Sequence, residues 1–252
     1  MTNIILCGCS GRMGEAVSKL IDDRNDAKIV AGVDVSTSAQ VSGFPIFQSI
    51  SEFTGKADVI LDFSHHTALP SLLNYAIATS TPLVVCTTGH TEEELSLMKA
   101  ASEKVAVFFS GNMSIGINLL IELCKKASET LGTSFDVEII EKHHNKKLDA
   151  PSGTALMLAN AIKDTREQTE YVYDRQSVRR QRSPEEIGIH SVRGGTIVGE
   201  HEVIFAGNNE MITISHSAMS REIFAAGAVR AAAYLSGKPA GMYNMSNVIN
   251  DK

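Results

Sequence analysis

The sequence has few cysteines and no arrangement of them that indicates cross-linking. The four cysteines, Cys7, Cys9, Cys86 and Cys124, are scattered along the chain. Cys7 and Cys9 are too close, in a segment that runs from a strand into a loop, to indicate a disulfide framework, and no spacing matches a zinc site. We therefore expect free thiols, no metal site and a reducing, cytoplasmic location.

Long apolar runs and an excess of positive charge are also missing. No apolar run approaches the roughly 18 residues of a membrane span, and the N-terminus enters a strand without a basic region or a cleavage site. The formal net charge is −6. We therefore expect neither a membrane nor nucleic acid as a partner. The basic run Arg179-Arg180-Gln181-Arg182 is expected to be a solvated loop or, alternatively, part of a rim that attracts anions.

The first 34 residues follow the order strand, glycine turn, helix, strand, acid. An apolar strand from Asn3 to Cys7 leads into the turn Gly8-Cys9-Ser10-Gly11-Arg12-Met13-Gly14, a helix from Glu15 to Ile21 and a strand from Ala27 to Val33. Asp34 follows, where an acid can accept hydrogen bonds from a ribose diol. This order is typical of a dinucleotide-binding unit. The alternative is an α/β domain whose first turn is merely tight, because the glycine spacing departs from G-x-G-x-x-G.

Strands and helices continue to alternate after this unit. Further strands are expected at Ala57–Phe63, Pro82–Cys86 and Val105–Phe109, with helices between them. Thr91 and Glu94 form a capping box at the start of one of these helices. Nearly continuous apolar strands between helices indicate a buried parallel sheet, and ligands bind beyond the carboxyl ends of such strands. The loops 86–89 and 110–113 are therefore candidates to line the nicotinamide half of a cofactor, although ordinary turn chemistry is the alternative for Thr87 and Thr88.

The pattern changes near residue 115, so we expect a second domain. A strand is expected from Asp136 to Glu141, and three later strands, within 187–216, are separated by glycine turns that indicate antiparallel neighbours. This predicts an open mixed or antiparallel sheet with helices on one face, whose other face a second subunit would cover. An alanine-rich helix from Arg221 to Leu235 resembles the first domain more than the second. The expected boundaries are 1–114 with 221–252, and 115–220.

The stretch Glu141 to Ala155, EKHHNKKLDAPSGTA, is the strongest candidate for a site. It places His143, His144, Lys146 and Lys147 ahead of a helix that Ser152 or Thr154 can cap. A helix N-terminus attracts anions, and Gly153 lets the backbone approach a ligand. A pocket for a small molecule with carboxylates is predicted, with an imidazole able to move a proton. A solvated loop is the alternative.

The other histidines are expected to be structural or solvated rather than catalytic. His90, His190, His201 and His216 lie in different elements. The pair His65-His66 follows the third strand, where it could approach a cofactor, but a surface position is favoured.

With these motifs in hand, the chain resembles the dihydrodipicolinate reductase (4-hydroxy-tetrahydrodipicolinate reductase) family over essentially its whole length. Glu141 to Ala155 matches the family signature E-x-H-H-x-x-K-x-D-A-P-S-G-T-A, and the turn 11–14, the loop 87–89 and the segment 221–230 also match. The resemblance implies an N-terminal Rossmann-type domain, a C-terminal α+β domain and a homotetramer built through the sheets of the C-terminal domain. The implied reaction is NAD(P)H-dependent reduction of a cyclic dicarboxylate in lysine and diaminopimelate biosynthesis.

The resemblance also implies roles for matching residues. His143 would be the catalytic proton donor or acceptor and Lys147 a second proton donor, while His144, Gly153 and Thr154 would bind substrate carboxylates. The implied cofactor-binding residues are Gly8, Cys9, Ser10, Gly11, Arg12, Met13, Asp34, Cys86, Thr87, Thr88, Ser110, Gly111, Asn112 and Met113. Two rival functions are a dehydrogenase of another small dicarboxylate and a non-catalytic NAD(H)-binding regulator.

Two departures from the family pattern affect the cofactor. Cys86 stands where the family has glycine ahead of Thr87-Thr88-Gly89, and Val35 follows Asp34 where members that use NADPH well often carry arginine. Asp34 would repel a 2′-phosphate, which Arg12 would partly offset. We therefore expect NADH to be preferred over NADPH.

Overall fold

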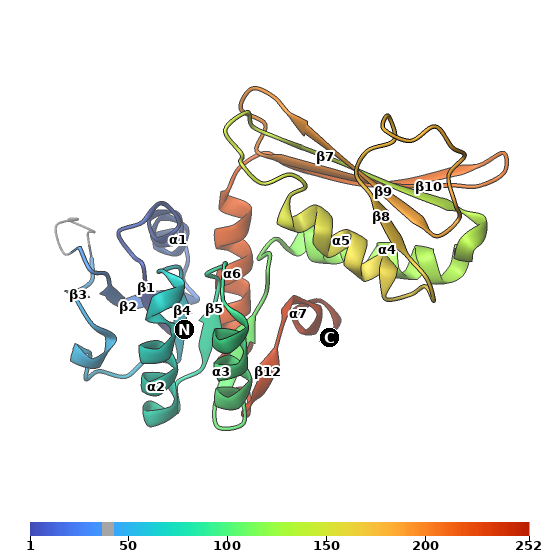
Figure 1. Cartoon of the computed structure of the whole chain (residues 1–252). Coiled ribbons are helices and arrows are strands. Elements are labelled where there is room, and N and C mark those ends of the chain that lie inside the picture. The colour runs from blue at the N-terminus through green and yellow to red at the C-terminus, as the bar shows by residue number, and fades with distance from the viewer. Residues whose placement is uncertain (37–42, 252) are drawn as a thin grey trace. The chain divides into compact units, whose positions relative to one another are not determined.

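The computed structural model describes residues 1–36 and 43–251, and the chain divides into two compact units (Figure 1). The first comprises Met1–Ser114 and Glu222–Lys252, and the second comprises Ile115–Arg221. No described helix is long and apolar enough to cross a membrane.

A parallel sheet forms the centre of the first unit. Its order is β12 (Gly241–Tyr243), β6 (Ala106–Phe109), β5 (Leu83–Val85), β4 (Val59–Asp62), β1 (Thr2–Cys7), β2 (Ala27–Val33) and β3 (Ile46–Phe47). Every neighbouring pair in this order is parallel. The parallel sheet predicted from the alternation is therefore confirmed, and so is the Rossmann-type domain that the resemblance implies. The two-residue β3 and the three-residue β12 escaped prediction because neither is long enough to show a pattern.

Helices cover both faces of this sheet, which explains why its strands are apolar on both sides. One face packs with α2 (Leu69–Thr79) and α3 (Glu92–Ser102) around Ile5, Ile60 and Val107. On the other side, α1 (Arg12–Asp22) contacts α6 (Glu222–Leu235), and α6 contacts β1, β4, β5 and β6. The predicted capping box of α3 is present, with Thr91 and Glu94 in reciprocal hydrogen bonds. The expected C-terminal tail is partly the short helix α7 (Met245–Asn250), which Asn244 caps.

The second unit holds a mixed sheet with helices on one face. Its order is β11 (Met211–Ala218), β10 (Gly199–Ala206), β7 (Asp136–His143), β9 (Glu186–Arg193) and β8 (Glu170–Val172). The helices α4 (Ile115–Leu131) and α5 (Gly153–Lys163) bury the side chains that alternate along one face, among them Ile139, Ile189 and Val203. The open mixed sheet is confirmed.

The expected antiparallel pairing of 187–192 with its successor is wrong. β9 pairs in parallel with β7, and β10 lies on the far side of β7. The turn Gly194-Gly195 therefore crosses the end of β7 instead of closing a hairpin. Its backbone is bound there, because Gly194 N–H donates to the His143 carbonyl (2.9 Å) and Asn145 N–H donates to the Gly195 carbonyl (3.2 Å). Gly195 has φ +48°, which a side chain would disfavour.

The basic run 179–182 lies in a loop whose Arg179, Arg180 and Gln181 are exposed, as expected for a solvated loop, but two of its arginines form ion pairs. Arg180 pairs with the buried Glu186 at 2.6 Å, and Arg182 pairs with Asp136 at 3.0 Å. Carboxylates of the second unit, the buried Glu186 and the partly exposed Asp136, therefore pair with two of its three arginines.

All four cysteines are free thiols, and Cys7, Cys9 and Cys124 are buried. Burial raises the pKa of each of these three thiols, to about 12 for Cys124.

Candidate active site

Close backbone contacts build the glycine turn at the end of β1. Gly8 has φ +73°, and a Cβ on it would lie 2.5 Å from the Phe63 carbonyl oxygen. A Cβ on Gly14 would lie 2.4 Å from the Gly8 oxygen. Both positions therefore require glycine. Gly11 is the N-cap of α1 and supplies no side-chain cap, so the first N–H groups of the helix can meet a phosphate.

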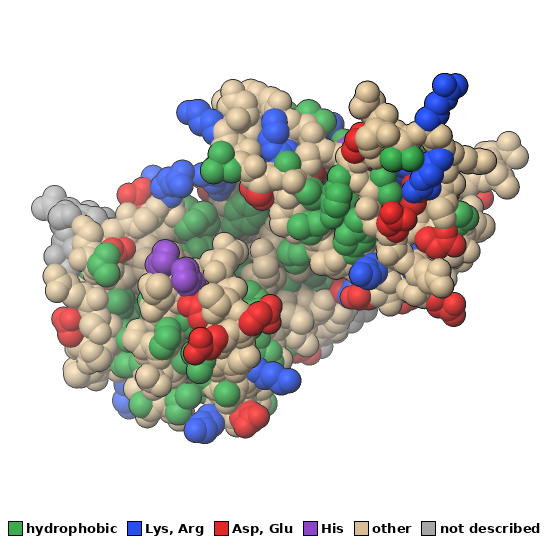
Figure 2. Space-filling view, in the orientation of Figure 1, with side chains coloured by type: hydrophobic (Ala, Val, Ile, Leu, Met, Phe, Trp, Pro, Cys, Tyr) green, Lys and Arg blue, Asp and Glu red, His purple; other side chains and the backbone are tan. Residues whose placement is uncertain are grey.

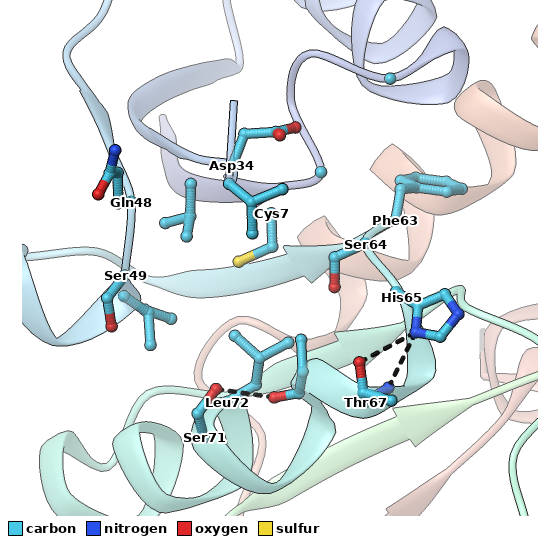
Figure 3. Close-up of a pocket in the computed structure, with 16 residues that line it drawn as sticks. Cys7, Asp34, Gln48, Ser49, Phe63, Ser64, His65, Thr67, Ser71 and Leu72 are labelled. Carbon is cyan, nitrogen blue, oxygen red and sulfur yellow. Dashed lines mark hydrogen bonds between the residues drawn. The ribbon is translucent and has the colours of Figure 1, made fainter. Parts of the chain in front are cut away.

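A cavity of about 490 Å³ opens at the carboxyl ends of β1, β2 and β4 (Figure 3). Gly8, Gly11 and Asp34 line it, together with Ser64 and His65 from the loop after β4. Asp34 accepts hydrogen bonds from Ser10 N–H and Ser36 N–H, both at 3.0 Å. A carboxylate has about four acceptor sites, so Asp34 can still receive ribose hydroxyls. The glycine turn, the N-terminus of α1 and the Asp34 carboxylate together fit a nicotinamide dinucleotide.

Cys9, in the glycine turn, is buried, whereas His65, in the loop after β4, is exposed. The Cys9 thiol is buried, and a Cβ on Gly32 would lie 2.7 Å from its sulfur, so only the backbone of Cys9 can serve a ligand. His65 is exposed and its Nδ1 lies 3.0 Å from Thr67 Oγ1. Figure 2 shows histidine side chains at the surface of the first unit. His65 nevertheless also lines the cavity, and His66 is half-buried with its Nδ1 2.8 Å from Glu94 Oε1.

The loops after β5 and β6 are organised by groups that the sequence patterns do not single out. Asp62, 1% exposed, accepts hydrogen bonds from Thr87 Oγ1 (2.8 Å) and from Ser64 N–H (2.9 Å), which ties the loops after β4 and β5 together. Burial raises the pKa of Asp62 above its usual value, although the hydrogen bonds from Ser64 and Thr87 act to lower it. Gly227 of α6 lies so close to the Met113 carbonyl that a Cβ would overlap it. The loop 110–113 thus packs directly against α6, a helix more than 100 residues later in the chain.

In the second unit, the end of β7 carries a buried acid–imidazole pair. His143 Nδ1 lies 2.6 Å from Glu141 Oε2, and both side chains are buried. Arg193, from the neighbouring strand β9, binds the same carboxylate through Nη1 (2.8 Å) and Nη2 (2.7 Å). Burial alone would raise the pKa of Glu141, but hydrogen bonds from Arg193 and His143 lower it to about 2. Glu141 is therefore ionised at neutral pH.

The N-terminus of α5 lies beside this pair. Ser152 is the N-cap, and its Oγ accepts from Ala155 N–H at 3.2 Å. Of the two expected caps, Ser152 is the one used. The same Oγ lies 3.1 Å from Nε2 of His201, a buried residue of β10 whose ring centroid is 5.2 Å from that of His143. Burial, and then the neighbouring His143, lower the pKa of His201 to about 4, so this ring is neutral at pH 7.

The rest of the cationic loop is more accessible. Lys147 Nζ lies 2.9 Å from Asp149 Oδ1, and this lysine lowers the pKa of Asp149. His144 and Thr154 are partly exposed, and Gly153 is exposed at the helix start. The structure therefore brings His143 and the helix N-terminus together in one unit. Arg193 and His201 were not identified as site residues from the sequence, because they are 50 or more residues from His143 along the chain.

Comparison with known proteins agrees with this arrangement. Residues 2–113 match the family model described as dihydrodipicolinate reductase, N-terminus, and residues 116–249 match the one described as dihydrodipicolinate reductase, C-terminus. The chain belongs to the dihydrodipicolinate reductase family. A 4-hydroxy-tetrahydrodipicolinate reductase of Clostridium tetani is 51% identical over 99% of this chain and 98% of its own. One of Caldanaerobacter subterraneus is 51% identical over the same shares.

Solved structures support the fold. A dipicolinate-bound dihydrodipicolinate reductase from Paenisporosarcina sp. TG-14 superposes with a TM-score of 0.80 at 24% identity, covering 97% of each chain. A probable dehydrogenase from Thermotoga maritima superposes with a TM-score of 0.66 at 11% identity, covering 98% of this chain and 92% of its own. Membership of the reductase family makes the chain an oxidoreductase, and the Rossmann-type unit implies a nicotinamide cofactor.

The depressed pKa of Glu141 predicts a loss of stability in acid. A carboxyl whose pKa is about 2 when folded and about 4.5 when unfolded stabilises the fold above pH 4.5. This contribution, about 3 kcal/mol at most, is lost as the pH falls from about 5 to 2. Urea unfolding at a series of pH values measures it, and Glu141→Gln should flatten the dependence in this window. An equally steep decline in the variant would contradict the assignment.

Proposed function

We propose that the chain reduces 4-hydroxy-tetrahydrodipicolinate to tetrahydrodipicolinate in lysine and diaminopimelate biosynthesis, with release of water. Supporting this proposal is the 51% identity, over nearly the whole chain, to relatives named for this reaction. The observation on the molecule that carries it is the buried His143 beside a helix N-terminus suited to carboxylates. The first unit is the dinucleotide-binding domain and the second the substrate-binding and oligomerisation domain.

The residues of the second unit bind the substrate and move a proton. The N–H groups at the start of α5, with Gly153, Thr154 and His144, receive the substrate carboxylates. Lys147 adds positive charge near them. His143, or Lys147, delivers the proton to the carbon next to the one reduced. The nicotinamide supplies the hydride when it is bound. Charge neutralisation and positioning by these groups lower the barrier to reduction.

The first unit holds the cofactor. The turn Gly8 to Met13 and Asp34 bind the adenosine and pyrophosphate half, and the loops 86–88 and 110–113 bind the nicotinamide half. NADH is preferred over NADPH, because the Asp34 carboxylate lies in the cavity and the following Val35, 91% exposed, adds no positive charge. Arg12, exposed at the start of α1, offsets part of the repulsion of a 2′-phosphate.

The enzyme is a cytoplasmic homotetramer in this proposal, assembled through the sheets of the second unit. The helices α4 and α5 cover one face of that sheet, and the opposite face presents exposed side chains such as Val192 and Met211. Sedimentation equilibrium should give four times the mass of 27.1 kDa. Replacing Val192 and Met211 together by lysine should lower the assembly state. A monomer that retains full activity would contradict the proposed assembly.

Replacing His143 by glutamine tests the chemical role directly. We expect kcat to fall by roughly 10²–10⁴-fold, as for other general acid–base groups, because glutamine cannot transfer a proton. NADH affinity, measured by fluorescence titration, should stay unchanged. The assay is NADH consumption with freshly generated substrate. A wild-type protein that binds cofactor and substrate without turnover would indicate a regulator instead, and activity with NAD⁺ and simple acids would indicate a dehydrogenase.

The cofactor preference is tested by placing a cation after the acid. Val35→Arg should raise kcat/KM for NADPH relative to NADH by about tenfold, which corresponds to about 1.4 kcal/mol of 2′-phosphate interaction. Val35→Gln, similar in length and uncharged, is the matched control and should leave the ratio nearly unchanged. Side-by-side titration of both reduced cofactors measures it. A wild-type protein that uses NADPH better than NADH would refute the preference.

A further inference from the structure

The ion pair between Glu141 and Arg193 joins three segments at the end of β7. The strands β7 and β9 run in parallel with His143 opposite Arg193, so the guanidinium lies over the carboxylate two residues before the imidazole. Arg193 binds both carboxylate oxygens, and its Nη2 also donates to the Asp149 carbonyl at 2.6 Å. One arginine therefore fixes the acid and the loop that leads into α5.

Each oxygen of Glu141 has a second partner with a functional neighbour. Oε2 lies 2.6 Å from His143 Nδ1, and Oε1 accepts from Ser152 N–H at 3.1 Å. Ser152 is the cap of α5, whose first turn is the anion-binding end. The carboxylate thus contacts the imidazole on one side and the start of the anion-binding helix on the other.

Stability alone is a weak reason for such an arrangement. Glu141 is fully buried and only 19% of the Arg193 side chain is exposed. Desolvating the charges of such a pair costs free energy that their attraction often only offsets. An apolar pair of similar volume would hold two strands together equally well. Directional hydrogen bonds to two separate functional groups are what an apolar pair cannot provide.

We propose that Glu141 and Arg193 are positioning residues that set the geometry of His143 and of the α5 N-terminus together, and that they fix the proton of neutral His143 on Nδ1. Nε2 is then the nitrogen that exchanges a proton with the substrate. This inference rests on the proposed function for its kinetic consequences, but its structural content does not.

The tautomer follows from the hydrogen-bonding capacities of the groups. An ionised carboxylate only accepts hydrogen bonds, so the ring nitrogen facing it carries a proton. The other nitrogen has open space beside it, because Gly199 has no side chain and a Cβ there would lie 3.1 Å from Nε2. Two titratable side chains lie next to the imidazole, Glu141 and the neutral His201 on β10, and Arg193 binds the same carboxylate. Lys147, in the loop, acts on the charge of His201 and pairs with Asp149.

Nuclear magnetic resonance of the wild-type enzyme tests the tautomer without any substitution in the pair. In protein labelled with ¹⁵N-histidine, proton–nitrogen correlations at about pH 9, where an ordinary imidazole is neutral, distinguish Nδ1–H from Nε2–H. His143→Gln assigns the signals. We expect His143 to be mainly Nδ1–H. A mainly Nε2–H ring would overturn the inference, even in a fully active enzyme, and the measurement stands even if the proposed substrate fails.

Two substitutions separate charge from position. Glu141→Asp keeps the negative charge but withdraws it by one methylene, and Arg193→Lys keeps the positive charge but replaces the two-pronged contact by a single ammonium. We expect Glu141→Asp to lower kcat about 10²-fold, as misplacement by about 1 Å can, and to raise KM for the substrate because the start of α5 is released. Arg193→Lys should act in the same direction, and NADH affinity should not change.

The control is Glu200→Gln. Glu200, on β10, accepts a hydrogen bond from Lys142 at 2.9 Å, and Lys142 is the neighbour of Glu141 in the chain, so the control also removes a carboxylate close to the pair. It should leave kcat, KM and the tautomer unchanged. Circular dichroism and thermal unfolding identify variants that remain folded. A folded Glu141→Asp variant with wild-type kcat, KM and tautomer would overturn the inference. Loss of stability with unchanged kinetics and tautomer would assign the pair a purely structural role and overturn it equally.

Discussion

The second unit depends on one carboxylate, Glu141, that is inaccessible to solvent. Glu141 is fully buried, and its charge is tolerated only because a guanidinium, an imidazole and a backbone N–H all point at it. These donors come from β7, β9 and the loop before α5. Satisfying a single buried charge therefore aligns two strands with the start of α5, where the proposed catalytic and substrate-binding residues lie.

The first unit is organised by close backbone approach rather than by charge. Gly8, Gly14 and Gly227 each lie where a side chain would meet a carbonyl group. The end of β1 therefore lies close to both the start of α1 and the loop after β4. In the same way, α6 lies close to the loop 110–113. A nucleotide site made largely of backbone depends on such distances, because N–H groups have no freedom to adjust as side chains do.

Much of this could be predicted from the sequence. Buried parallel strands are apolar runs, so β1, β2, β4, β5 and β6 were visible, and the helix between Ser152 and Lys163 was marked by its cap. The partner of β9 was not predictable, because glycine turns indicate hairpins and do not show that a strand can cross the end of its neighbour. The sequence also did not identify Arg193 and His201 as site residues, because sequence patterns do not show which strands pair. Their proximity to His143 exists only through the register of β7 with β9 and β10.

The buried cysteines give the two units separate chemical reporters. Cys7 and Cys9 lie inside the first unit, Cys124 lies inside the second, and burial keeps each as a neutral thiol. Since only a thiolate attacks an alkylating reagent, these sulfurs react when their own surroundings open. The rate at which each thiol is modified therefore reports how often the structure around it opens. Local opening near the glycine turn can thus be followed separately from local opening near α4.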